Sequence, residues 1–193
     1  LKKQPLGILN MKLSSIELGE ASVEQEKVLS RAQSTIGFVP NLIKKMANAP
    51  VIAEAYLTVG EIFSKSSFSA IEQQLILLTV SRYHECAYCM AAHSAIAKMQ
   101  SVPKEIIEAI RNDEDLSNPK LAALRNLTEN MVATRGNPDE SVLKEFLEVG
   151  YDDSQVLEII LGISMKILSN YTNHVAETEL DEMMEPERWH VNK

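Results

Sequence analysis

The spacing of hydrophobic and polar residues along this chain follows the period of the α-helix. In every long segment the apolar residues recur three or four positions apart, and none shows sustained two-residue alternation. The first pattern is typical of amphipathic helices and the second of strands. We therefore expect an all-α fold. The clearest helices are predicted over about 21–35, 42–48, 51–64, 71–83, 86–99 and 156–168. The first should bury one side, formed by Val23, Val28, Leu29 and Ala32.

Residues that favour helix starts support these boundaries. Ser69 with Glu72, and Asp152 with Gln155, have the spacing of a capping box, in which each residue's side chain bonds to the other's backbone. Asn41 is a candidate N-cap because it follows a break at Gly37 and Pro40. Prolines are favoured in the first turn of a helix. This is the expected place of Pro103, of Pro119 after a cap at Asn118, and of Pro138 after a cap at Asn137.

Two of the predicted helices, 71–83 and 156–168, are more apolar than a helix at a protein surface. The run from Leu75 to Val80 contains a single polar residue, so that helix is expected at the centre, buried nearly all round. Together the two helices carry more apolar surface than one small domain can bury. We expect the surplus to contact neighbouring subunits of a homo-oligomer, with one subunit shaping its neighbour's site.

The composition narrows the classes of protein that remain. Hydrophobic residues make up 45% of the 193 and aromatic residues 5%, which suits one helical domain of ordinary size. The net charge of −8, without a block of lysine and arginine, gives no support for nucleic-acid binding. No apolar run approaches the ~20 residues that span a bilayer, and residues 1–5 lack the apolar segment of a secretory signal. We expect a cytoplasmic protein without a membrane partner.

The expected organisation is an N-terminal arm over residues 1–20, a helical domain over 21–185 and a polar tail over 186–193. A weak internal repeat, referred to below as the internal echo, suggests a duplicated helical pair within the domain. Gln74 precedes Cys86 by twelve residues, and Glu158 precedes Asn170 by twelve, through apolar sequence in both cases. Only the first copy carries thiols. A histidine follows each copy: His93 and His174.

The chain has only two cysteines, and they lie three residues apart with a histidine four residues further on. On a helix, Cys86, Cys89 and His93 form one stripe, because each turn takes about 3.6 residues. Two thiols beside a proton acceptor are the minimum parts for reversible dithiol–disulfide chemistry. In the cytoplasm, such a pair indicates catalysis or metal binding rather than a structural disulfide.

The nucleophile in such chemistry is the thiolate, which is a minor form of an ordinary cysteine at neutral pH. The N-terminus of the helix favours a thiolate at Cys86, whereas His93, one turn beyond Cys89, favours one there. We assign Cys89 as the attacking thiolate and Cys86 as the resolving partner. Tyr88 lies between the two cysteines. Its hydroxyl either forms a hydrogen bond near the thiols, or the ring simply packs at the start of the helix.

Other interpretations of the same residues stay open. The thiols could be an inert buried pair. They could also bind zinc with His84 and His93, although no second Cys-x-x-Cys exists to complete four ligands. His174 either lines the same pocket or is a hydrogen-bonded structural residue. His84 and His190 look like surface residues.

The motifs resemble those of a known superfamily. Cys86-x-x-Cys89-x-x-x-His93 after a capped apolar helix resembles the carboxymuconolactone decarboxylase superfamily and, within it, the alkylhydroperoxidase D-like, peroxidase-related branch. Residues 37–41 (Gly-Phe-Val-Pro-Asn) look like the branch's N-terminal signature, and residues 170–174 with Leu180-Asp181 look like its C-terminal one. The resemblance covers roughly residues 30–185.

This resemblance implies an alkylhydroperoxidase D-like helical bundle, assembly into trimers or hexamers, and thiol peroxidase activity in antioxidant defence, without a cofactor. The substrate would be a hydroperoxide. An external dithiol, such as a lipoyl group or a thioredoxin-like protein, would reduce the resulting disulfide.

One position departs from the family pattern. The family's proton relay has a glutamate twelve residues before the first cysteine, and this chain has Gln74 there. Glutamine can orient a histidine or a water molecule but cannot accept a proton. Glu158 is a speculative replacement. Two alternatives to a thiol peroxidase stay open. One is a lyase of the carboxymuconolactone decarboxylase type, which does not need two thiols. The other is a non-catalytic redox-sensing module, which Gln74 at the acid position favours.

Overall fold

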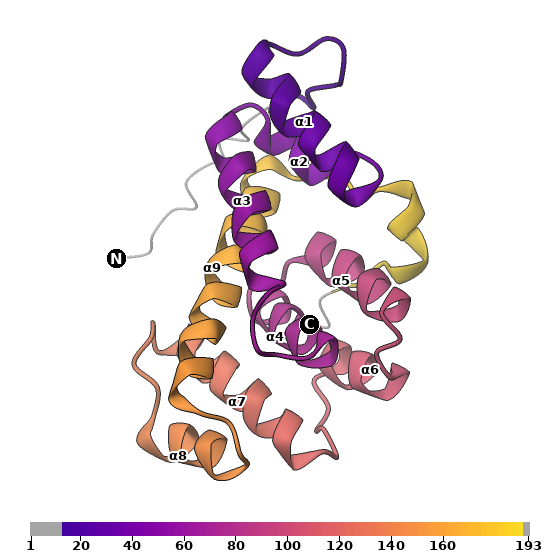
Figure 1. Ribbon diagram of the computed structural model, residues 1–193. Helices are drawn as coiled ribbons and strands as arrows, with labels where there is room; N and C mark the ends of the chain where they lie inside the picture. The colour runs from indigo at the N-terminus through magenta and orange to yellow at the C-terminus, as the bar shows by residue number, and fades with distance from the viewer. Residues whose placement is uncertain (1–12, 191–193) are drawn as a thin grey trace, which may run out of the picture.

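Helices form all the regular secondary structure of residues 13–190, the part of the chain that the computed structural model describes. The predicted all-α fold is confirmed. A long helix, α9, runs along one side of the molecule, and most of the other helices pack against it or against α4 at the centre (Figure 1). In chain order the elements are α1 (Val23–Ile36), α2 (Asn41–Met46), α3 (Pro50–Phe63), α4 (Ala70–Tyr83), α5 (Ala87–Met99), α6 (Lys104–Asn112), α7 (Pro119–Ala133), α8 (Glu140–Glu148), α9 (Asp153–Ala176) and the 3-10 helix η1 (Glu182–Glu187).

The central position predicted for the apolar helix α4 is confirmed. Every residue from Gln74 to Ser81 is buried, and α4 packs against α5, α6, α7 and α9. The chain itself therefore covers most of the apolar surface of α4, which we had expected to contact neighbouring subunits. The surplus apolar surface lies on α9 instead, where several large side chains are exposed: Leu157, Ile160, Tyr171 and Val175.

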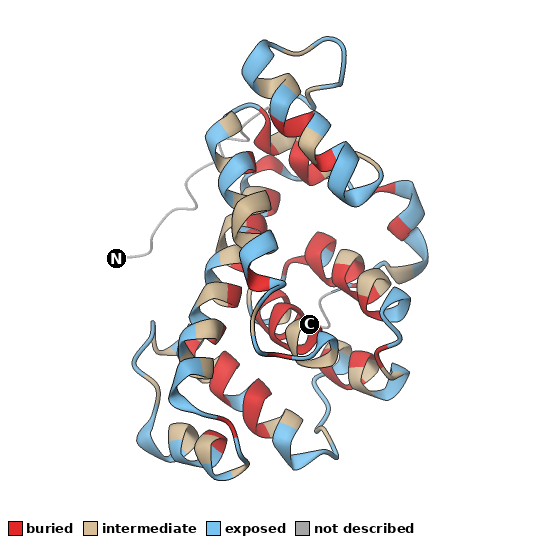
Figure 2. Cartoon of the chain, viewed as in Figure 1, coloured by how far each residue is buried: buried red, intermediate tan, exposed pale blue. Residues whose placement is uncertain are grey.

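The buried apolar residues form two clusters. The larger one is built around α4, α7 and the first half of α9, and includes Ile76, Leu124 and Phe146. The smaller one joins α1, α2 and α3 to the start of α5 and contains both cysteines. Buried positions accordingly line the inner faces of the helices in both halves of the molecule (Figure 2). The two thiols thus lie in the smaller core, where α5 meets the N-terminal helices.

Three of the six predicted helix starts are confirmed. Ser69 with Glu72 and Asp152 with Gln155 form capping boxes, and Asn118 caps α7 with Pro119 in the first turn. Four predicted details are wrong. Pro40 takes the N-cap position of α2 in place of Asn41. Asp139 takes that of α8, while Asn137 donates to the Thr134 carbonyl and Pro138 precedes the helix. Pro103 is the N-cap residue of α6 rather than a first-turn residue. Val23, at the exposed end of α1, is 72% exposed.

The ends of the chain are partly described. Residues 1–12 of the predicted arm and 191–193 of the predicted tail lie outside the described residues. In the remainder of the arm, the Ile16 N–H donates to the Lys44 carbonyl. In the remainder of the tail, Trp189 is buried, and its indole N–H donates to the Arg111 carbonyl at 3.0 Å. Within residues 13–190, no helix has the length and apolar character needed to cross a bilayer.

The internal echo has a different structure in its two copies. From Gln74 to Cys86 the chain leaves α4 and turns into α5. From Glu158 to Asn170 it stays inside the single helix α9. The twelve-residue spacing therefore does not correspond to a duplicated helical pair.

Gly162 lies where α9 crosses α3 and α4, and replacing it with alanine tests this crossing. An added Cβ would lie 2.9 Å from Ile76 Cγ2 and 3.0 Å from Phe63 Cε2, and both of these side chains are buried. We expect Gly162→Ala to lower the free energy of unfolding by about 1–2 kcal/mol, because overpacking outweighs the gain in helix propensity. Urea titration followed by circular dichroism measures this.

Gly60→Ala in α3 is the matched control. Its Cβ would meet only the flexible end of Met165, at 3.2 Å. The same measurement should show no loss of stability, or a gain of up to about 1 kcal/mol. Equal losses in the two variants would contradict the proposed crossing.

Candidate functional site

A tight turn between α4 and α5 places the first cysteine. Glu85 adopts the left-handed backbone conformation, with φ of 54°, which is uncommon for a residue other than glycine. The turn lets the Cys86 N–H donate to the Ser81 carbonyl at 2.9 Å. Cys86 is therefore the N-cap residue of α5, and its own carbonyl accepts from the Met90 N–H. Such strain is typical of functional sites.

Both thiols are free, almost fully buried, and held by side chains of α9. Cys86 and Cys89 are each 1% exposed. The amide of Asn173 donates to Cys89 Sγ at 3.2 Å and to Cys86 Sγ at 3.7 Å. The hydroxyl of Ser169 lies 3.7 Å from Cys89 Sγ. A single amide thus contacts both sulfurs, which brings together the two thiols that the motif predicted to work as a pair.

The side chains of α9 that surround the thiols form a polar stripe within an apolar helix. Spacings of three, four and seven residues place them on one helix face, and all are buried. The stripe consists of Lys166, Ser169, Asn170 and Asn173. Sequence reasoning used the two asparagines only as a family signature and did not consider Lys166 or Ser169. The signal was present, because polar residues recur at helical spacing in the second half of an otherwise apolar helix.

The surroundings of the two thiols drive their pKa values apart. Burial alone would raise the pKa of Cys89, but a hydrogen bond from Cys86 and the charge of Lys166 outweigh it and hold the pKa well below its ordinary value. The same hydrogen bond, together with burial, raises the pKa of Cys86. These opposite directions favour ionisation of Cys89 over Cys86. The roles of attacking and resolving thiol stay a prediction from the sequence.

His93 lies on α5 one turn beyond Cys89, and it is 5% exposed. Its Nδ1 lies 3.0 Å from the amide oxygen of Gln74 on α4. Because an amide oxygen only accepts, Nδ1 carries the proton and Nε2 is the free acceptor. Burial and the charge of Lys166 hold the pKa of His93 well below its usual range, so the imidazole is neutral. Among the described hydrogen bonds, none joins His93 to either sulfur.

Four other candidates lie elsewhere. Glu158 accepts from the backbone and hydroxyl of Ser67, at 2.6–3.0 Å, and so does not replace the missing acid of the relay. His174 is exposed and does not line the thiol site. His84 is half-buried between Tyr83 and Tyr171 rather than at the open surface, and burial lowers its pKa. His190 is exposed, as predicted.

Tyr88, between the two cysteines, connects the start of α5 to both family signatures. Its hydroxyl donates to Asp181 at 2.5 Å and accepts from the Leu42 N–H at 3.3 Å. Asp181 also accepts from the Asn41 N–H at 3.0 Å. Residues from three distant parts of the chain therefore meet on one buried carboxylate. A cavity of about 410 Å³ beside Tyr88 is lined by residues that include Thr178 and Trp189 but neither thiol.

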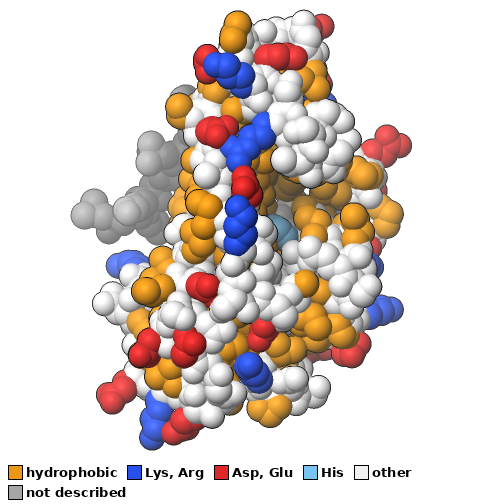
Figure 3. Space-filling model, viewed as in Figure 1, with side chains coloured by type: hydrophobic (Ala, Val, Ile, Leu, Met, Phe, Trp, Pro, Cys, Tyr) orange, Lys and Arg blue, Asp and Glu red, His pale blue; other side chains and the backbone are white. Residues whose placement is uncertain are grey.

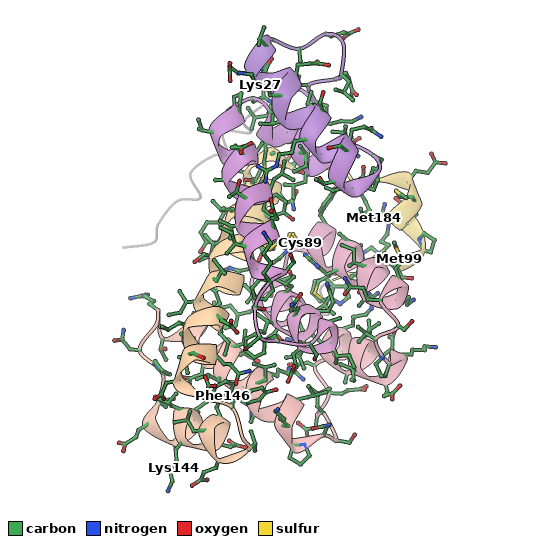
Figure 4. The ribbon with its side chains drawn as sticks, viewed as in Figure 1. Lys27, Cys89, Met99, Lys144, Phe146 and Met184 are labelled. Atoms are coloured by element: carbon green, nitrogen blue, oxygen red, sulfur yellow. The ribbon has the colours of Figure 1, made fainter. Side chains whose placement is uncertain are left out.

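The thiol region lies below a hollow in the surface. Figure 3 shows this hollow near the middle of the molecule, with apolar side chains around its rim and a histidine visible at its floor. Cys89 lies in the same part of the view, between α3, α4 and α5 (Figure 4). Among residues 13–190, no group of three or more His, Cys, Asp and Glu side chains is placed to hold a metal ion.

Comparison with known proteins agrees with the motif and the fold. Residues 50–130, which include both cysteines and His93, match the carboxymuconolactone decarboxylase family. A comparison with curated proteins gave no match. This match confirms the predicted resemblance to the carboxymuconolactone decarboxylase superfamily, and solved structures that share the fold confirm the predicted alkylhydroperoxidase D-like architecture.

One such structure is a peroxidase-related protein with an alkylhydroperoxidase AhpD core from Ralstonia eutropha JMP134. It is 18% identical, with a TM-score of 0.77 over 91% of this chain and 93% of that one. A peroxidase-related protein from Silicibacter sp. TM1040 is 18% identical, with a TM-score of 0.71 over 94% and 99%. The debrominase Bmp8 is 19% identical, with a TM-score of 0.76 over 92% and 96%. This fold therefore occurs in proteins with different names and substrates.

Replacing the Tyr88 hydroxyl tests the connection between the two signatures. Tyr88→Phe leaves the Leu42 N–H and one side of a buried carboxylate without a partner, so we expect it to lower the free energy of unfolding by about 1–3 kcal/mol. Urea denaturation measures the change. Tyr171→Phe, at a tyrosine that is 51% exposed, is the control and should stay within about 0.5 kcal/mol of the natural chain. A Tyr88→Phe variant as stable as this control would show that the connection contributes nothing.

Proposed function

We propose that this protein is a thiol-dependent peroxidase that reduces hydroperoxides through a dithiol–disulfide cycle of Cys86 and Cys89. The observation that carries the proposal is the paired environment of the two sulfurs. The Asn173 amide contacts both sulfurs, and their surroundings lower the pKa of Cys89 and raise that of Cys86. This is the division of labour that attack followed by resolution requires.

The cycle balances with the groups present and an external reductant. The Cys89 thiolate attacks one oxygen of the hydroperoxide, the O–O bond breaks, and the alkoxide or hydroxide takes up a proton. Cys89 is then a sulfenic acid. The Cys86 sulfur attacks it, an S–S bond forms, and the hydroxyl group leaves as water with the proton of the Cys86 thiol. An external dithiol, of the lipoyl or thioredoxin-like kind, reduces the disulfide by two exchange steps.

In this mechanism His93 has a supporting role. Its protonated Nδ1 is held by Gln74, which leaves Nε2 as the acceptor of the ring. The neutral imidazole orients a substrate O–H or a water molecule and receives a proton only transiently. Gln74 is thus a positioning residue for His93, and it supplies no charge of its own.

Single-turnover kinetics of the two cysteine variants tests the roles. With an alkyl hydroperoxide and a dithiol donor, Cys86→Ser and Cys89→Ser should each abolish steady-state turnover. Without the donor, Cys86→Ser should still consume one equivalent of hydroperoxide and form a sulfenic acid that dimedone traps. Cys89→Ser should consume the hydroperoxide far more slowly, because burial still raises the pKa of the remaining Cys86 thiol.

The two variants act as controls for each other, since each removes one thiol from the same buried pair. Equal single-turnover reactivity would contradict the assignment of the attacking sulfur. Turnover that survives in both would refute the dithiol mechanism. Decarboxylation of a cyclic lactone acid retained by both variants would favour the lyase alternative. A change of oligomeric state on oxidation, without peroxide turnover, would favour a redox-sensing module.

A further inference from the structure

Lys166 is a fully buried lysine that the proposed cycle has not used. It is 0% exposed, in the middle of α9, and its Nζ has no hydrogen-bond partner among the described residues. Taking an ammonium group out of water is costly unless an opposite charge compensates for it. The position expected to carry the relay's acid is the neutral Gln74, and Glu158 is held by Ser67. The compensating charge must therefore come from another kind of group.

The position of Lys166 points to the thiol pair. It lies three and seven residues before Ser169 and Asn173, which contact Cys89, so it is on the same face of α9. In agreement with this placement, the charge of Lys166 lowers the pKa values of both cysteines and of His93. Its burial and its place on this face put Lys166 on the side of α9 that contacts the thiols.

We propose that Lys166 is the positioning residue that holds Cys89 as a thiolate, forming a buried ion pair with it across the α5–α9 contact. In this pair the negative charge of the thiolate compensates the buried ammonium group, and the positive charge of the lysine favours ionisation of the thiol. It also replaces the relay that Gln74 leaves without an acid. The inference deepens the proposed function by naming what activates the attacking sulfur, and the ion pair itself requires no peroxide turnover.

His93 cannot supply this charge. Its Nδ1–H donates to Gln74, and burial together with the lysine's charge keeps the ring neutral. The other titratable groups near the thiols are the Tyr56 hydroxyl from α3, whose pKa burial raises, and the half-buried His84. Neither carries a positive charge at neutral pH. The groups to be considered in any titration of Cys89 are therefore Cys86, Tyr56, His84, His93 and Lys166.

The pH dependence of thiol alkylation tests the ion pair directly. The reduced protein is treated with iodoacetamide at a series of pH values, and modification of Cys89 is located by fragment-ion mass spectrometry. Because an opposite charge nearby typically lowers a thiol's pKa by 1–3 units, Lys166→Met should raise the alkylation midpoint of Cys89 by about 1–2 units. A folded Lys166→Met protein with an unchanged midpoint would overturn the proposal.

Lys144→Met is the matched control, because it removes the same charge from the exposed surface. Lys144 lies on α8, at the opposite end of the molecule from α1 and well away from Cys89 (Figure 4). Its loss should leave the midpoint of Cys89 within about 0.2 units, since surface charges beyond a Debye length are screened. An equal shift in both variants would show a general charge effect and would overturn the specific pair.

A second measurement keeps the natural lysine in place and does not depend on the folding of the Lys166 variant. Cys89→Ala removes the thiolate and leaves the buried ammonium group without an opposite charge, so its urea midpoint should fall further than that of Cys86→Ala, which removes the other thiol of the same buried pair. Equal midpoints in the two alanine variants would show that there is no ion pair between Lys166 and Cys89. Neither experiment measures peroxide turnover, so failure of the peroxidase proposal would leave both results intact.

Discussion

The contact between Cys89 and the polar face of α9 is the interaction on which the rest of this site depends. Burial by itself favours a protonated, unreactive thiol. The structure opposes this preference with a hydrogen bond from Cys86 and with two groups of α9, the charge of Lys166 and the Ser169 hydroxyl, which lies 80 residues further along the chain. The site therefore exists only when α9 is docked, and the packing of α9 on α3 and α4 is part of the chemistry.

A second set of contacts fixes the other side of the thiol pair. Tyr88 holds the first turn of α5 against Asp181, which also binds the start of α2. The thiols are thus fixed between two layers, the α9 stripe on one side and the N-terminal helices on the other. This explains why the two signature segments, far apart in the sequence, bear on the same function: they set the position of the helix that begins with Cys86.

Local signals in the sequence predicted much of this structure. The capping boxes at Ser69 and Asp152, the burial of α4 and the pairing of the two cysteines all follow from spacing within one helix. Predictions that depended on tertiary partners were less successful. Asn41 is not the N-cap of α2, and its backbone N–H donates to the Asp181 carboxylate. Glu158 accepts from the backbone N–H of Ser67 and so takes no part in the predicted proton relay. Lys166 was missed because the polar residues at helical spacing in α9 were not considered together as one buried stripe.

The most direct measurement is the mass and peptide map of the reduced protein after one equivalent of hydrogen peroxide. The account predicts that the chain loses two hydrogen atoms and that digestion yields a peptide in which Cys86 and Cys89 are linked. A chain of unchanged mass, or one in which oxygen has been added to methionine while both thiols stay free, would contradict the claim that these two sulfurs form a redox pair.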